Sequence, residues 1–184
     1  MATVGLRDLY QAAITEDENG IATYGIPKRL AKAISADLSV TVAEAILYAD
    51  DAVDETEKEF VSGELKLNVN DISQEDAAEL LGQTLDDDGV VYAGGDDIAP
   101  YKAIGFRAKK PGGKFRYLWL YKVKFAVPNE SYATKGDGIE FKTPEIVGTF
   151  IKRADGLWKA DHVAEPTEDI AQNWFEEVRE KNVI

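Results

Sequence analysis

The sequence predicts a mainly β protein: an antiparallel β-sandwich or barrel-like fold with a short flanking helix and a C-terminal helix. Apolar and polar residues alternate with a period of two along most of the chain, which is typical of half-buried strands. Turn signals such as Asn19-Gly20 and Pro111-Gly112-Gly113 separate these segments. Helical signals are confined to two short segments. The 184 residues suit a single domain that begins with an N-terminal arm.

A hairpin is predicted at the start of the chain. Residues 6–15 and 22–30 form its strands, and Pro27 indicates an edge position or a bulge in the second strand. Further along, the acidic segment 49–58, ADDAVDETEK, is too polar to belong to a core. We therefore expect segment 49–58 to be an exposed loop.

Alternating strands flank this acidic segment on both sides. One set of positions is apolar: Leu38, Val40, Val42, Leu65, Leu67 and Val69. In the second strand the positions between them are polar: Glu64, Lys66, Asn68 and Asn70. A strand with one apolar and one polar face belongs to an antiparallel sheet that has a solvated side.

Two segments carry helix signals. Ser73 is a good N-cap, acidic residues follow it in the first turn, and Gly82 ends the helix. Near the C-terminus, a helix over about 167–181 would align Ile170, Trp174 and Val178 in one apolar stripe.

The strongest hairpin joins residues 101–110 to residues 114–127. In the return strand one set of alternating positions is Phe115, Tyr117, Trp119, Tyr121, Val123 and Phe125. A platform that stacks nucleic-acid bases needs exposed aromatics beside Lys or Arg. Here the basic residues alternate with the aromatics and fall on the opposite face, which favours a core role. Beyond this hairpin, residues 138–143 and 145–153 form another predicted strand pair, and residues 157–163 a last strand.

Composition gives no positive sign of an enzyme. Cysteine is absent and His162 is the only histidine, so thiol chemistry, disulfides and Cys–His metal sites are excluded. Two Asp–Gly-rich stretches at 86–89 and 94–97 leave a minor alternative, calcium binding, but they lack the EF-hand order of ligands. The net charge of −13 disfavours tight binding to phosphate backbones. We expect no catalytic residue, no cofactor and no metal, and no apolar run is long enough for a membrane span.

Two segments carry a family resemblance. Residues 32–51, KAISADLSVTVAEAILYADD, and residues 105–150, with GFRAKKPGGKFRYLWLYKVKFAVP and ATKGDGIEFKTPEIVGTF, resemble the major tail protein family. These proteins build the tail tube of siphophages and prophages of Gram-positive bacteria. Together with the N-terminal GLRDLY and ITEDENG, the resemblance covers most of the chain. Its specificity lies in the order and extent of the motifs.

The resemblance implies a structural virion protein. It implies a β-sandwich subunit that forms hexameric rings, which stack around a lumen through which DNA leaves the capsid without specific binding. It also implies a tape measure protein, a tail terminator and baseplate or distal tail proteins as partners. The expected location is the virion tail, after assembly in the cytoplasm of the host bacterium.

Three sets of residues are candidates for roles in such a tube. The candidate ring-stacking loop contains Asp50, Asp51, Asp54, Glu55 and Glu57. Its candidate basic partner is the hairpin tip with Lys109, Lys110 and Lys114. The candidate lumen face contains Glu64, Lys66, Asn68, Asn70, Glu140 and Lys142, where carboxylates would repel DNA phosphates. The alternative function is a carbohydrate- or cell-surface-binding β-sandwich module of a phage particle, with a small hydrolase as a third possibility.

Overall fold

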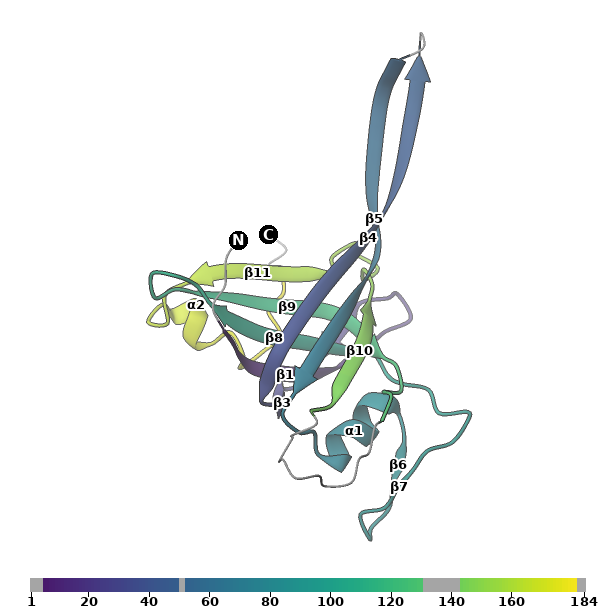
Figure 1. The fold of residues 1–184 in the computed structure, drawn as a ribbon, viewed down its shortest axis with the longest axis vertical. Coiled ribbons are helices and arrows are strands. Elements are labelled where there is room, and N and C mark those ends of the chain that lie inside the picture. Colours follow the sequence, from purple (N-terminus) through teal and green to yellow (C-terminus); the bar gives the residue numbers. More distant parts are fainter. Residues whose placement is uncertain (1–4, 50–51, 131–142, 182–184) are drawn as a thin grey trace, which may run out of the picture.

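This computed structural model describes residues 5–49, 52–130 and 143–181. The fold is mainly antiparallel β and sandwich-like, as the alternation predicted (Figure 1). The strands are β1 (Leu6–Glu16), β2 (Ala22–Tyr24), β3 (Lys28–Ala31), β4 (Ala33–Ala49), β5 (Ala52–Val69), β6 (Thr84–Leu85), β7 (Val91–Tyr92), β8 (Lys102–Lys109), β9 (Phe115–Phe125), β10 (Glu145–Phe150) and β11 (Lys159–Ala164). The helices are α1 (Gln74–Leu81) and α2 (Asp169–Gln172).

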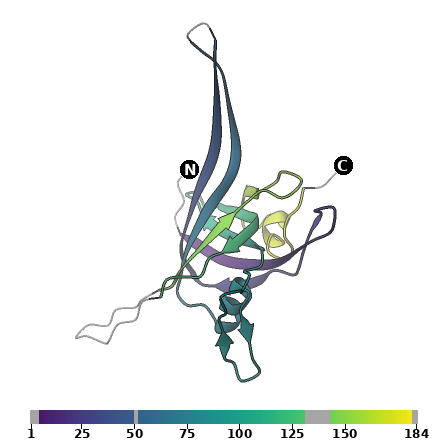
Figure 2. The same cartoon turned by 90° about the vertical axis from the view of Figure 1, so that its right-hand side faces the viewer.

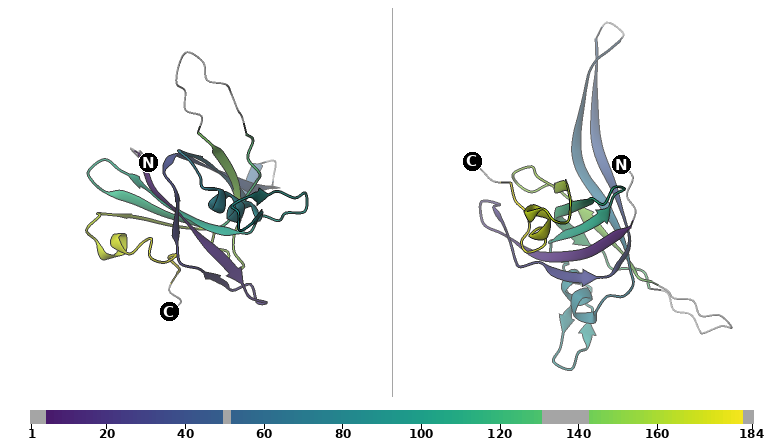
Figure 3. Two further views of the ribbon diagram at one scale, coloured as in Figure 1. Left: turned by 90° about the horizontal axis from the view of Figure 1, so that it is seen from below. Right: turned by 90° about the vertical axis from the view of Figure 1, so that its left-hand side faces the viewer.

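The main sheet has the strand order β2-β1-β8-β9-β10-β5-β4, and it curls without closing into a barrel. β3 pairs with β1, and β11 pairs with the part of β9 that β10 leaves free. Inside the curl lies an aliphatic core, and α1 covers one end of it through Leu80. A second, aromatic core lies on the other side of β9, under the C-terminal segment. Figures 2 and 3 show the helices at opposite ends of the body.

The N-terminal hairpin and the first helix are confirmed. Gly20 adopts a φ of 77°, and its turn joins β1 to β2. Pro27 lies in the break between β2 and β3, where no ladder hydrogen bond is required. The Ser73 side chain accepts a hydrogen bond from the backbone N–H of Asp76, and Gly82 ends α1 in the left-handed conformation.

β9 is buried on both faces, and the prediction that its six alternating residues share one face is wrong. Leu118 and Leu120 belong to the aliphatic core, whereas Tyr117 and Trp119 belong to the aromatic core. The register between β8 and β9 shifts between Lys102 and Ile104, where β9 carries one extra residue. Such a bulge reverses the facing of everything beyond it. Val123 and Phe125 consequently join the aliphatic core.

The predicted C-terminal helix over 167–181 is also wrong, because α2 ends at Gln172. Downstream carbonyls serve as acceptors for β9 side chains instead of for helical N–H groups. The Trp119 indole donates to the Trp174 carbonyl at 3.1 Å, and the Tyr121 hydroxyl donates to the Arg179 carbonyl at 2.7 Å. The apolar side chains predicted for this helix still pack in the core, since Trp174 and Val178 are buried in the aromatic core.

The third correction concerns segment 49–58, whose described residues lie in strands and not in a loop. β4 runs to Ala49 and β5 begins at Ala52, and the two strands pair along their whole length. The predicted strand over 138–143 lies almost entirely outside the described residues, whereas β10 and β11 confirm the strands expected after it. Neither described helix has the length and apolar character needed to cross a membrane.

Candidate assembly surface

The outer half of the β4–β5 hairpin, residues 42–49 and 52–59, projects from the body; we call it the ribbon (Figures 1 and 2). Eight residues at about 3.3 Å each give it a reach of roughly 26 Å. β5 pairs with β10 only from Gly63 to Asn68, and β4 pairs with no described strand except β5. Both edges of the ribbon are therefore open. A two-stranded ribbon with open edges is marginally stable in water by itself.

Aromatic packing anchors the base of the ribbon to the body. The Phe60 ring stacks on Trp158 at 4.7 Å between centroids and lies 6.1 Å from Phe150. Gly63 makes room for this cluster, because a Cβ there would lie 2.0 Å from the Phe150 ring. The Glu59 carboxylate accepts a hydrogen bond from the Lys152 ammonium at 2.5 Å. The direction in which the ribbon leaves the body is thus fixed by the core.

One face of β4 continues the inner face of the sheet outward into the ribbon and is apolar. Four of its side chains are solvent-exposed by 37% to 51%; we call them the β4 apolar stripe, or the apolar stripe: Leu38, Val40, Val42 and Ile46. They share a side with the core, since Leu38 pairs with buried Leu65 and Val42 pairs with Phe60. Between them the only charges are Glu44 and Lys58, which pair with each other at 3.2 Å. A row of exposed apolar side chains on an open strand marks an interaction surface.

The opposite face of the ribbon is acidic. Glu57 pairs in register with Ala45, and Glu59 pairs with Ala43. Of the other candidate stacking residues, Asp54 and Glu55 lie in β5, whereas Asp50 and Asp51 lie outside the described residues. The described part of the acidic segment therefore belongs to an amphipathic ribbon, with Asp54, Glu55 and Glu57 on β5.

Three candidate lumen residues, Glu64, Lys66 and Asn68, form one polar wall on β5, as the alternation predicted. Glu64 and Lys66 are exposed and lie 3.2 Å apart as an ion pair, while Leu65 and Leu67 between and beside them are fully buried. Asn68 is half-buried and donates to the Ser35 hydroxyl at 3.0 Å. The same wall continues with Asn70, which is exposed. Glu140 and Lys142 lie outside the described residues.

The candidate basic residues stand at the turn between β8 and β9, on a different side of the body from the ribbon (Figure 1). Lys109 and Lys114 are exposed, and Lys110 is partly buried. The Lys114 ammonium is 4.0 Å from Glu165, a weak contact between exposed groups. The structure does not bring this turn to the ribbon within one chain.

Arg153 connects three segments of the fold by hydrogen bonds, and no sequence motif indicates this role. Its guanidinium donates to Glu180 at 2.7 Å, to the Tyr24 hydroxyl at 3.1 Å and to Asp155. Hydrogen bonds from Arg153 hold the pKa of the Asp155 carboxyl below its usual range, and burial raises the pKa of Tyr24 to about 12. The tight turn at residues 154–156 is the local signal that could have drawn attention to Arg153. Its distant partners, Tyr24 and Glu180, leave no local pattern in the sequence.

The lowered pKa of Asp155 predicts a pH dependence. A carboxyl whose pKa is depressed by folding stabilises the protein above its unfolded pKa and ceases to do so as pH falls through the folded value. We expect the thermal midpoint of the wild type to fall between about pH 5 and pH 2 more steeply than that of Asp155→Asn. Calorimetry across this range checks it, and parallel curves would contradict it.

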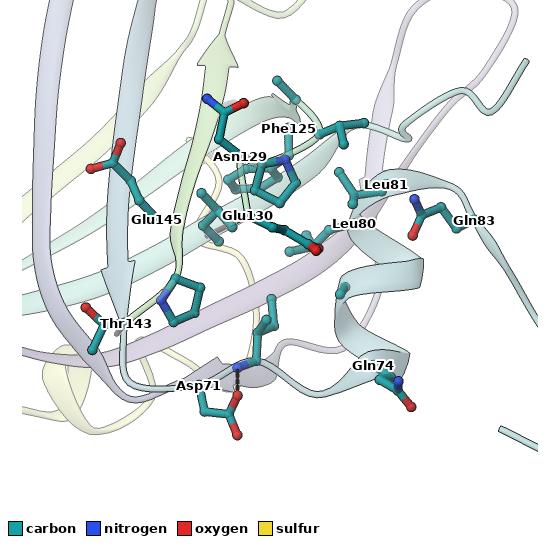
Figure 4. A pocket seen from close by; sticks show the side chains of 17 residues that line it. Asp71, Gln74, Leu80, Leu81, Gln83, Phe125, Asn129, Glu130, Thr143 and Glu145 are labelled. Atoms are coloured by element: carbon teal, nitrogen blue, oxygen red, sulfur yellow. Dashed lines mark hydrogen bonds between the residues drawn. The ribbon is translucent and has the colours of Figure 1, made fainter. Parts of the chain in front are cut away.

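A cavity of about 710 Å³ lies between α1 and the ends of β9 and β10. In Figure 4, Leu80 and Leu81 project from α1 toward the end of β9, near Phe125. The cavity opens beside Glu130 and Thr143, the residues that border segment 131–142. Its walls are apolar and its rim carries carboxylates, without a histidine or a cysteine. Among the described residues no cluster of His, Cys, Asp or Glu is arranged to hold a metal ion.

His162, the only histidine, lies half-buried on β11 and stacks on the Trp174 ring at 6.0 Å. Its cross-strand partner is Tyr117. Through this stacking, His162 packs against the aromatic core. The chain matches no protein-family model and no curated protein.

Proposed function

We propose that this chain is the major subunit of a phage tail tube, a structural virion protein that assembles into stacked hexameric rings. The observation that carries the proposal is the ribbon, with its open edges and its exposed apolar stripe. Such a feature is an aggregation hazard in a monomer, but in a symmetric assembly copies of the same chain can cover it. The resemblance to major tail proteins points to the same kind of assembly.

The polar wall of Glu64, Lys66 and Asn68 supports a channel-lining role in that assembly. Its backing residues are buried, so one side of the sheet is free to face water along a lumen. The chain as a whole has a net charge of −13, and DNA would meet repulsion instead of the counterion release that produces binding. A tube with a basic lumen would contradict this role.

The proposal includes the partners and location that belong to a tail tube. A tape measure protein would occupy the growing tube, a terminator would cap it, and baseplate or distal tail proteins would begin it. DNA would pass through the lumen without specific binding. The subunit would be made in the host cytoplasm and end in the tail of the virion, and no catalytic step is assigned to it.

The alternative, a module that binds carbohydrate or a cell surface, receives less support from the aromatic side chains. Glycan-binding grooves expose aromatic rings. All three tryptophans are instead engaged in packing: Trp119 and Trp174 are buried, and Trp158 stacks on Phe60. Tyr92 is 58% exposed, but it stands alone on the short strand β7.

Negative-stain electron microscopy of the concentrated protein, with its tail-assembly partners, tests the proposal. Rings or hollow tubes are the expected result. Monodisperse monomers that bind glycans on an array would establish the alternative function instead. Turnover of a substrate panel would overturn both.

A further inference from the structure

The segment that follows α2, residues 173–181, contains no helix or strand, and we call it the strap. It lies on the aromatic core, in which Trp174 and Val178 are buried. Among the described residues no strand of the sheet pairs with it. The strap is therefore held in place by side chains, whereas the strands around it are held by backbone pairing.

Two side chains of β9 bind the backbone of the strap. The Trp119 indole donates a hydrogen bond to the carbonyl of Trp174, and the Tyr121 hydroxyl donates one to the carbonyl of Arg179. Hydrogen bonds to main-chain atoms hold a segment of almost any sequence, and pockets for its side chains then supply the specificity. This division is typical of a groove that binds an extended peptide.

Aromatic rings of the sheet bind the first two anchors of the strap. The Trp174 ring lies 5.7 Å from the Tyr117 ring, measured between centroids. The Phe175 ring stacks on Tyr10 at 4.6 Å, with an angle of 9° between the ring planes. Val178 is the third buried anchor. The groove therefore selects two adjacent aromatic residues and one apolar residue after them.

A cation marks the far end of the groove. The Arg153 side chain is only 8% exposed, and it donates a hydrogen bond to the Glu180 carboxylate at 2.7 Å. The Glu180 side chain is 48% exposed, so it is already well solvated. If the strap left, Arg153 would keep its hydrogen bonds to Asp155 and to the Tyr24 hydroxyl. This end therefore favours an acidic residue and releases it at little cost.

The strap leaves two buried polar atoms of the contact unpaired. His162 Nε2 and Trp174 Nε1 have no hydrogen-bond partner among the described residues, although the two rings stack at 6.0 Å. Most buried polar atoms are paired, and leaving one unpaired costs free energy. The strap is thus an imperfect occupant. A segment that brought a hydrogen-bonding side chain to His162 would fit the groove better.

We propose that this face of the sheet is a peptide-binding groove, which the strap occupies and from which an extended segment of a partner protein displaces it. The partner segment has two adjacent aromatic residues, an apolar residue three positions later and a carboxylate two positions beyond that. The strap itself has this pattern from Trp174 to Glu180. The inference goes beyond the proposed function and does not depend on it.

Binding of a labelled peptide tests the groove. The probe is a fluorescein-labelled peptide with the sequence of residues 167–181, TEDIAQNWFEEVREK. A control peptide carries Trp174→Ala and Val178→Ala. The proteins are the full chain and a strap variant, which is the full chain with these same two substitutions. Far-UV circular dichroism checks that the strap variant keeps its strands, and Val178→Ala alone replaces it if it does not.

Fluorescence anisotropy should show that the strap variant binds the probe at least about tenfold more tightly than the wild type. In the wild type the tethered strap competes at roughly millimolar effective concentration. Adding Tyr121→Phe to the strap variant should weaken binding about fivefold, the effect of one lost hydrogen bond. The control peptide should not bind. Equal affinities for the two proteins, or no binding to the folded variant, would overturn the groove.

Sedimentation velocity separates a partner protein from a second copy of this chain as the occupant. The strap variant is mixed with wild-type protein at a concentration at which neither assembles alone. No complex should form, because each wild-type strap is held in its own groove. A complex would show that a second copy supplies the segment, and it would overturn the assignment to a partner protein.

Discussion

A Val42→Ser, Ile46→Ser double variant is expected to remain folded and to lose tube assembly. Both side chains are about half exposed in the free chain, so their removal should change the free energy of unfolding by only about 1 kcal/mol. In an assembled tube each copy would lose roughly 3 kcal/mol of apolar burial at every contact. That loss raises the critical concentration for assembly about a hundredfold.

Sedimentation velocity and electron microscopy across a concentration series measure this effect. The matched control is Ala43→Ser, Ala45→Ser, which changes the same strand on its opposite face. The control should assemble as the wild type does. If the stripe variant assembles at wild-type concentration, the apolar stripe is not an assembly surface.

The second large effect is expected in the aromatic core. Trp119 is fully buried against Phe175, and its ring occupies the space that Gly105 leaves by lacking a side chain. Trp119→Ala should lower the free energy of unfolding by about 3–5 kcal/mol, as large-to-small changes in cores do. The lost hydrogen bond to the Trp174 carbonyl should also release the C-terminal segment.

Chemical denaturation measures the first effect, and limited proteolysis after residue 172 measures the second. Trp119→Phe keeps most of the ring but cannot donate the hydrogen bond, so it should show the proteolysis with a smaller loss of stability. Tyr92→Ala, at an exposed position, should change neither. A Trp119→Ala protein with wild-type stability and protease resistance would contradict the packing described here.

The local signals of the sequence predicted the class of fold well. Asn19-Gly20 and Ser73 act through backbone geometry and hydrogen bonds within a few residues, so their effects can be deduced from the residues alone. The buried and polar faces around Leu65 and Lys66 were predictable for a similar reason, because the two-residue period is a property of one strand.

What the sequence could not reveal depends on distant partners. The acidic segment 49–58 has the composition of a loop, yet its described residues form strands, because strands that extend beyond the core can carry as many charged residues as a loop does. The bulge in β9 is set by its pairing with β8 and leaves no mark in the alternation. Helix α2 ends at Gln172, and Trp119 and Tyr121 of β9 donate hydrogen bonds to backbone carbonyls of the segment that follows.

The candidate assembly surface was half predictable. Acidity pointed to segment 49–58, and the basic tip with Lys109 was visible as a cluster. The apolar stripe was missed, because Val40 and Val42 read as ordinary core positions of an alternating strand. Only the structure shows that β4 extends beyond the core, so that these side chains stay exposed.

Hydrogen exchange on β4 and β5, in the free subunit and in assembled material, tests the central claim most directly. In the free subunit, backbone amides of residues 42–49 and 52–59 should exchange fast, while those of residues 64–69 at the inner end of β5 stay protected. On assembly the ribbon amides should become as protected as the core, because neighbouring copies cover its stripe and its edges. Ribbon amides that exchange equally fast in both states would contradict the account.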